Sequence, residues 1–126
     1  MLLANEFKKP VIIHCVGAFQ EIIKIKKDLN ITVPAIIHGF SKNETVAKDL
    51  VKNGFYISFG KYLFENPLLK NVFHKIPNDS FFLETDSSHQ KIEAIYNLAA
   101  AYKNISIDDV KKNIENNFKK VFKISL

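Results

Sequence analysis

The sequence has little cysteine, glycine or proline, and it has no long apolar run. Its single cysteine, Cys15, has no second cysteine to pair with and no Cys-x-x-Cys spacing for structural zinc, as is typical of proteins in a reducing compartment. No segment approaches the roughly 18 consecutive apolar residues of a membrane span, and the first residues lack the pattern of a secretory signal. These absences argue against a disulfide scaffold or a membrane protein and predict a cytoplasmic protein.

The composition is that of an ordinary globular protein. With 126 residues, of which 47% are hydrophobic and 25% charged, the chain is predicted to form one domain over residues 1–126. The net charge of +5 comes from lysines spread along the whole length, a pattern typical of solvated helix faces. Such a basic surface would suit a polyanionic substrate, although it does not require one.

Short runs of β-branched and aromatic residues alternate with longer segments of helical periodicity. The runs cover residues 11–14, 35–38, 55–59 and 81–86, and their nearly continuous apolar character is typical of strands buried in a parallel sheet. Residues 18–29 and 43–53 carry apolar stripes of helical spacing, and Gly54 is expected to end the second helix. This alternation predicts an α/β fold of right-handed β-α-β units.

The last third of the chain is predicted to be helical. Residues 91–102 carry one apolar stripe of helical spacing. A second helix that begins near Ser106 is expected to bury Val110, Ile114, Phe118, Val121 and Phe122. Residues 61–75 are less regular, and there we expect a short helix that begins at Pro67.

Three of the four predicted strands end in a side chain that can bind a metal: His14, His38 and Asp86. Because the carboxyl ends of parallel strands lie at one edge of the sheet, these side chains are expected to converge. Imidazole and carboxylate ligands suit Zn, Mn or Fe, and a site richer in carboxylates suits Mg, so the ligands do not name the ion. Each histidine taken singly is equally well explained as a hydrogen-bonded residue at a strand end. Their joint placement favours a metal site.

Five segments together carry a resemblance to a known family. They are KPVIIHC (residues 9–15), IIHGFS (36–41), GFYISFG (54–60), LETD (83–86) and ENNFKKVF (115–122). Their order and spacing resemble the second half of TatD-family metal-dependent hydrolases, a family of (β/α)₈ TIM barrels that hydrolyse phosphodiesters, commonly as deoxyribonucleases. The resemblance implies that residues 1–126 form a partial domain, the C-terminal half of the barrel.

The resemblance also implies roles for the residues at the strand ends. The resemblance implies that His14 and His38 bind one divalent metal (Mg, Mn or Zn). It also implies that Asp86 binds a second metal and is the catalytic residue that orients or deprotonates the attacking water. Glu84 supports the site without touching a metal, and DNA is the implied substrate. The family takes its other ligands from a His-x-His motif on the first strand and a Glu on the fourth. This chain begins near the fifth strand, so at most a partial site is expected.

Local departures from the family pattern concern substrate contacts. Val16 and Gly17 stand where many relatives carry Arg and a polar residue, and residues 87–90 lead directly into a helix where longer relatives insert a basic loop. Weaker or different contacts with the substrate phosphates are therefore expected. Phe40, Tyr62 and Phe64 are the aromatic candidates for stacking on a base, although packing at the rim explains them as well.

Three hypotheses about function follow. The first is a metal-dependent phosphodiesterase, in its full-length form a TatD-type deoxyribonuclease. The second is a catalytically silent half-barrel, because four strands are too few to close a barrel; it would associate with a second copy or with a separate N-terminal half. The third, a nucleotide-binding domain without metal, is disfavoured because no Gly-x-Gly-x-x-Gly loop follows any strand.

Overall fold

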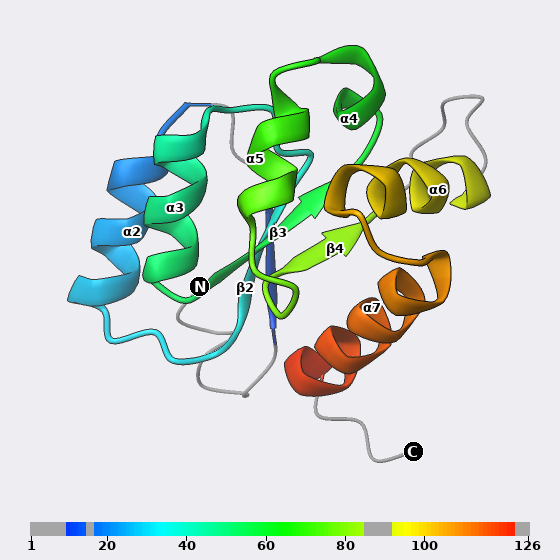
Figure 1. Cartoon of the computed structure of the whole chain (residues 1–126). Coiled ribbons are helices and arrows are strands. Elements are labelled where there is room, and N and C mark those ends of the chain that lie inside the picture. Colours follow the sequence, from blue (N-terminus) through cyan, green and yellow to red (C-terminus); the bar gives the residue numbers. More distant parts are fainter. Residues whose placement is uncertain (1–9, 15–16, 85–91, 123–126) are drawn as a thin grey trace.

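A four-stranded parallel sheet forms the centre of the molecule (Figure 1). The computed structural model describes residues 10–14, 17–84 and 92–122. The strands follow the sequence order: β1 (Val11–His14), β2 (Ala35–His38), β3 (Phe55–Phe59) and β4 (Phe81–Leu83). The parallel α/β fold is confirmed, and the first three strands have the predicted bounds. For the fourth, residues 85 and 86 lie outside the described part of the chain.

Six helices are described between and after these strands. They are α2 (Phe19–Asp28), α3 (Glu44–Lys52), α4 (Tyr62–Glu65), α5 (Leu69–Lys75), α6 (Ile92–Lys103) and α7 (Ile107–Phe122). Helix α3 begins where the Asn43 side chain accepts a hydrogen bond of 3.0 Å from the Val46 N–H, and it ends before Gly54, whose φ of +83° suits glycine. Instead of one helix, residues 61–75 form two, with Pro67 between them. None of the described helices is long and apolar enough to cross a membrane.

The core lies between the helices and one face of the sheet. Side chains alternate between the two faces of a strand, and the residues that face the helices, among them Ile37, Ile57 and Phe59, are fully buried. The other set includes the two histidines at the ends of β1 and β2, together with Ile12, which is 65% exposed. The apolar face therefore builds the core, and the opposite face keeps polar strand ends accessible.

Aromatic rings form a continuous chain through this core. Neighbouring rings of Phe19, Phe40, Phe59, Phe73 and Phe81 meet edge to face, with centroid separations of 6.2, 5.8, 5.0 and 5.0 Å along the series. Edge-to-face contacts place the positive ring edge against the negative ring face and add to the energy of burial. The chain of rings ties α2 and α5 to the last two strands.

Helix α7 presents a different stripe to the core from the predicted one. Phe118 was expected inside, but it is 43% exposed, whereas Asn117 is 2% exposed. The Asn117 amide donates hydrogen bonds of 2.9 Å to the backbone oxygens of Asn78 and Phe81. Because the Asn117 amide bonds one carbonyl before β4 and one at its start, a polar residue takes the inward position. The buried stripe consequently includes Val110, Asn117 and Val121.

Lys103, at the end of α6, is buried against two aromatic rings. Its Nζ donates a hydrogen bond to the backbone oxygen of Ile76 and lies 4.9 Å from the Phe73 centroid and 5.3 Å from the Phe81 centroid. Burial disfavours the charged ammonium and lowers the pKa of Lys103 to about 8 from its ordinary value near 10.5. In the folded chain this amine therefore titrates in the mildly alkaline range.

The lowered pKa predicts a rise in stability with pH. Between about pH 8 and pH 10.5 the unfolded chain holds more protons on Lys103 than the folded chain, so the free energy of unfolding increases with pH. In Lys103→Met this contribution is absent, so wild type should gain about 1–2 kcal/mol relative to the variant from pH 7 to 10.5, allowing for partial screening by water. Urea unfolding at several pH values measures it.

Lys70→Met is the matched control for this experiment. Lys70 also lies over an aromatic ring, 5.8 Å from the Tyr102 centroid, but it is exposed. Its replacement is expected to leave the pH dependence of stability unchanged. Parallel pH profiles for wild type and Lys103→Met would contradict the assignment of the lowered pKa to this amine.

Candidate functional site

Two histidines stand side by side at the carboxyl ends of β1 and β2. His14 and His38 are register partners in the parallel ladder, so their side chains leave the sheet on the same face. Their ring centroids are 5.6 Å apart and the rings are tilted by 46°. The structure thus brings together two histidines that end the first and second strands of one β-α-β unit.

Glu84, just beyond β4, holds one of these histidines. Its Oε2 lies 2.6 Å from Nδ1 of His38 and accepts a second hydrogen bond, also of 2.6 Å, from the Ser58 hydroxyl. The Glu84 backbone N–H donates to the oxygen of Phe59, which continues the pairing of β4 with β3. A carboxylate on one imidazole nitrogen fixes the ring and its tautomer, and it leaves Nε2 of His38 to meet a ligand.

Two glycines lie beside this arrangement, each for a different reason. A Cβ atom at Gly60 would lie 2.8 Å from Cγ of Glu84, so the backbone after β3 packs directly against the carboxylate-bearing side chain. Gly39 has a φ of +67°, in the left-handed region that favours glycine, and its missing Cβ would stand 3.9 Å from His14 Cε1 and from Glu84 Oε1. At Gly60 a side chain would collide with Glu84, whereas at Gly39 there is space for a Cβ and the left-handed φ is what favours glycine.

A small open pocket of about 120 Å³ joins these groups. It is lined by His14, His38, Gly39, Lys61, Tyr62 and Glu84. Lys61 lies in the turn after β3 and Tyr62 is the first residue of α4. The Lys61 Nζ lies 5.2 Å from the centroid of the Tyr62 ring. The pocket combines two imidazoles, one carboxylate and one ammonium, a set that can bind a cation and an anion next to each other.

Sequence reasoning missed two residues of this site, Ser58 and Lys61. Ser58 could have been found, because the alternation of strand residues places it on the same face as the histidines. Lys61 has no such local mark, since its position depends on the turn into α4. Tyr62 was a candidate only for stacking on a base.

Asp86, the predicted catalytic residue and metal ligand, lies outside the described residues, as do Cys15 and Val16. Within residues 10–14, 17–84 and 92–122, no group of three or more His, Cys, Asp or Glu side chains could hold a metal ion. What the described part offers is an imidazole pair in which one ring is oriented by a carboxylate. Imidazole nitrogens suit transition-metal cations, so these residues fit part of a metal site.

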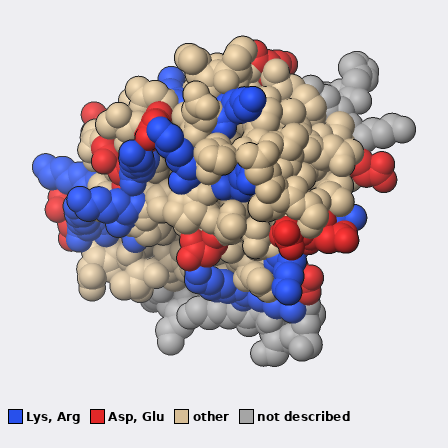
Figure 2. All heavy atoms as spheres, viewed as in Figure 1, with Lys and Arg blue, Asp and Glu red and all other residues tan. Residues whose placement is uncertain are grey.

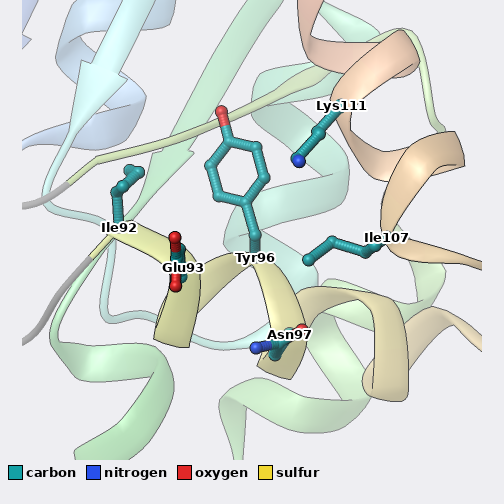
Figure 3. Close-up of a pocket in the computed structure, with 6 residues that line it drawn as sticks. All are labelled: Ile92, Glu93, Tyr96, Asn97, Ile107 and Lys111. Carbon is teal, nitrogen blue, oxygen red and sulfur yellow. The ribbon is translucent and has the colours of Figure 1, made fainter.

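A larger cavity, of about 500 Å³, lies between α6 and α7 (Figure 3). Ile92, Glu93, Tyr96, Asn97, Ile107 and Lys111 line it. Burial raises the pKa of the Tyr96 phenol, and Figure 3 shows that Tyr96 and Lys111 extend toward the same space. The lining contains neither histidine nor the strand-end groups, so this cavity is separate from the histidine pocket.

A family model described as TatD related DNase matches residues 1–123. The chain is similar to the uncharacterized metal-dependent hydrolase YabD of Bacillus subtilis, with 38% identity over 87 residues that cover 67% of this chain and 34% of the relative. It is also similar to the uncharacterized metal-dependent hydrolase YcfH of Escherichia coli, with 25% identity over 97% of this chain and 52% of the relative. A putative deoxyribonuclease TATDN1 homolog of Vairimorpha ceranae is 28% identical over 72% of this chain and 33% of its own length.

Solved structures show the same fold. The chain superposes on a TatD family hydrolase of Entamoeba histolytica with a TM-score of 0.84 at 16% identity, over 96% of this chain and 53% of that one. For YJJV, a TatD homolog of Escherichia coli, the TM-score is 0.85 at 20% identity, over 98% and 54%. The predicted fold class is confirmed: the chain has the architecture of the C-terminal half of a (β/α)₈ barrel. It spans about half the length, or less, of the relatives that it matches.

Proposed function

The chain belongs to the TatD family of metal-dependent hydrolases, and on that premise we propose that it supplies the second half of a divalent-metal-dependent phosphodiesterase that acts on DNA. The observation that carries the proposal is the His14–His38 pair with His38 oriented by Glu84. The names of the relatives, which include metal-dependent hydrolases and a putative deoxyribonuclease, support both the reaction class and the substrate.

The residues of this chain would hold and orient the reacting groups. His14 and His38 would bind a divalent cation (Mg, Mn or Zn), with two cations in the complete site. When bound, such cations polarise a phosphate oxygen and make water easier to deprotonate. Glu84 keeps His38 in one orientation through Nδ1. An imidazole held in this way binds a metal more tightly than one that is free to rotate.

Asp86 is the proposed catalytic residue, which orients the water and accepts its proton. In the hydrolysis, the water oxygen forms a bond to phosphorus, the ester P–O bond breaks, and the leaving oxygen takes up a proton as an alcohol. A carboxylate close to the attacking water fits the first of these proton transfers. Asp86 lies two positions after Glu84 in the sequence.

A metal titration tests the proposal. Calorimetry with Mn²⁺ is expected to show binding by the chain, and His38→Ala or His14→Ala should weaken it by about 10-fold or more, because each removes one imidazole ligand. His74→Ala is the matched control: His74 is exposed on α5, where its Nδ1 bonds the backbone oxygen of Tyr102 at 2.8 Å. Equal Mn²⁺ affinity in wild type and His38→Ala would refute the proposed ligands.

The second hypothesis, a silent half-barrel, also has a supporting observation. Strands β1 and β4 are the edges of the described sheet, and Ile12 on β1 is 65% exposed on the face away from the core. An exposed apolar residue on an edge strand invites pairing with further strands. In this alternative the chain would pair with a separate N-terminal half or with a second copy.

A further inference from the structure

Lys61 is the cationic side chain among the described residues that line the histidine pocket. The pocket otherwise contains the Glu84 carboxylate and two imidazoles, which are neutral when they bind a metal. From this placement we propose that Lys61 binds the anionic phosphodiester of the substrate, and that the Tyr62 ring positions its ammonium. The inference deepens the proposed function and rests on it.

The backbone of Lys61 is firmly fixed next to the site. It follows Gly60, which packs against the Glu84 side chain, and its carbonyl accepts hydrogen bonds from the N–H groups of Phe64 at 3.0 Å and Glu65 at 3.2 Å. Leu63, two residues on, is fully buried. The lysine side chain therefore starts from a defined point at the rim.

Tyr62 supplies that positioning. The Lys61 Nζ lies 5.2 Å from the Tyr62 centroid, within the range in which the negative face of an aromatic ring attracts an ammonium. Both side chains are half-buried and both line the pocket. An ammonium held there can bind an anion while keeping its contact with the ring, because a lysine has three N–H donors.

Phosphate diesters match this site in charge. Each diester carries one negative charge, which one ammonium can balance through a charge-assisted hydrogen bond. Other lysines gather over α2 and α3 with acidic residues among them (Figure 2). Those surface charges can attract any polyanion, whereas Lys61 is placed to contact the single diester that enters the histidine pocket.

The experiment measures binding of thymidylyl-thymidine, which has one diester, by NMR titration of the whole chain at low salt. Lys61→Met is expected to weaken binding by about 5- to 10-fold, since it removes one charged contact. Lys61→Arg, which keeps the charge, and Tyr62→Phe, which keeps the ring, should stay within about 3-fold of wild type. Lys70→Met, which removes the exposed lysine over Tyr102, is the matched control and should have little effect.

An uncharged methylphosphonate analogue of the same dinucleotide distinguishes charge from shape. With this analogue, wild type and Lys61→Met should bind equally. The inference is overturned if Lys61→Met binds thymidylyl-thymidine as wild type does, if Lys70→Met loses as much, or if wild type does not bind the diester at all.

The test separates this inference from the proposed function. Lys61→Met is not expected to weaken Mn²⁺ binding, because Lys61 is not a ligand and its positive charge repels the cation. If His38→Ala leaves the Mn²⁺ affinity unchanged but Lys61→Met loses the dinucleotide, the metal site fails and the anion site survives. If His38→Ala weakens Mn²⁺ binding but Lys61→Met binds the dinucleotide as wild type does, the metal site survives and the role of Lys61 is wrong.

Discussion

When it is joined to the first four β/α units of a TatD barrel, the chain is expected to hydrolyse bis(p-nitrophenyl) phosphate with Mn²⁺. In this protein, His38→Ala is expected to lower kcat/KM by about 10³-fold or more. The first half of YcfH, a relative that this chain matches over 52% of its length, is a suitable source of the missing units. The loss is large because metal ligands act as a unit, and removing one disables the others. A spectrophotometric assay of nitrophenolate release measures it.

The chain without these units is expected to show little hydrolysis. Its sequence contains no His-x-His motif, so it lacks ligands that the proposed reaction requires. Robust turnover by the 126-residue chain that is lost in Asp86→Ala would contradict this expectation. If that turnover came with a dimer in sedimentation analysis, the second copy would be the partner.

Two further variants, one at the partner of His38 and one at a histidine outside the site, make the activity test specific. Glu84→Gln keeps an oxygen near Nδ1 of His38 but removes the charge, and it should lower kcat/KM by about 10- to 100-fold. His74→Ala, whose histidine bonds only the Tyr102 carbonyl among the described residues, should remain at the wild-type level. A loss in His74→Ala as large as in His38→Ala would indicate damage to the fold rather than to a metal site.

The sequence was sufficient to predict the parts of the fold that depend on local pattern. The first three strands have the predicted bounds because each is a short apolar run beside a glycine or proline. The meeting of His14 and His38 was also predictable, because parallel strands place their carboxyl ends at one edge. The strand bounds depend on short apolar runs and the meeting of the histidines on strand direction, and both can be read from a single sequence.

Other features depended on contacts that are distant in sequence. Asn117 is buried because it bonds the carbonyls of Asn78 and Phe81, and nothing near it in the chain marks those acceptors. Apolar periodicity favoured Phe118 instead, which is one position, or about 100° of helix turn, away. Lys61 was missed for a similar reason, since its place at the pocket depends on the turn that follows Gly60.

The largest effect on stability is expected from Phe73→Ala. Phe73 is fully buried, and its ring meets both Phe59 and Phe81 edge to face at 5.0 Å. Removing the ring takes apolar contacts from both strands and leaves a cavity that the sheet cannot close, so the free energy of unfolding should fall by about 4 kcal/mol. Urea unfolding followed by circular dichroism measures the change.

Two further phenylalanine variants show whether the loss of stability in Phe73→Ala comes from the chain of aromatic rings. Phe118→Ala makes the same substitution on α7, where the ring is 43% exposed and touches Phe122 at 4.6 Å, and it should cost less than about 1 kcal/mol. Phe73→Leu refills most of the volume without the edge-to-face contacts, so its loss in free energy of unfolding should lie between those of Phe118→Ala and Phe73→Ala. It can still be measured if Phe73→Ala does not fold. Equal costs at Phe73 and Phe118 would mean that stability does not depend on the linked rings that hold α5 against the sheet.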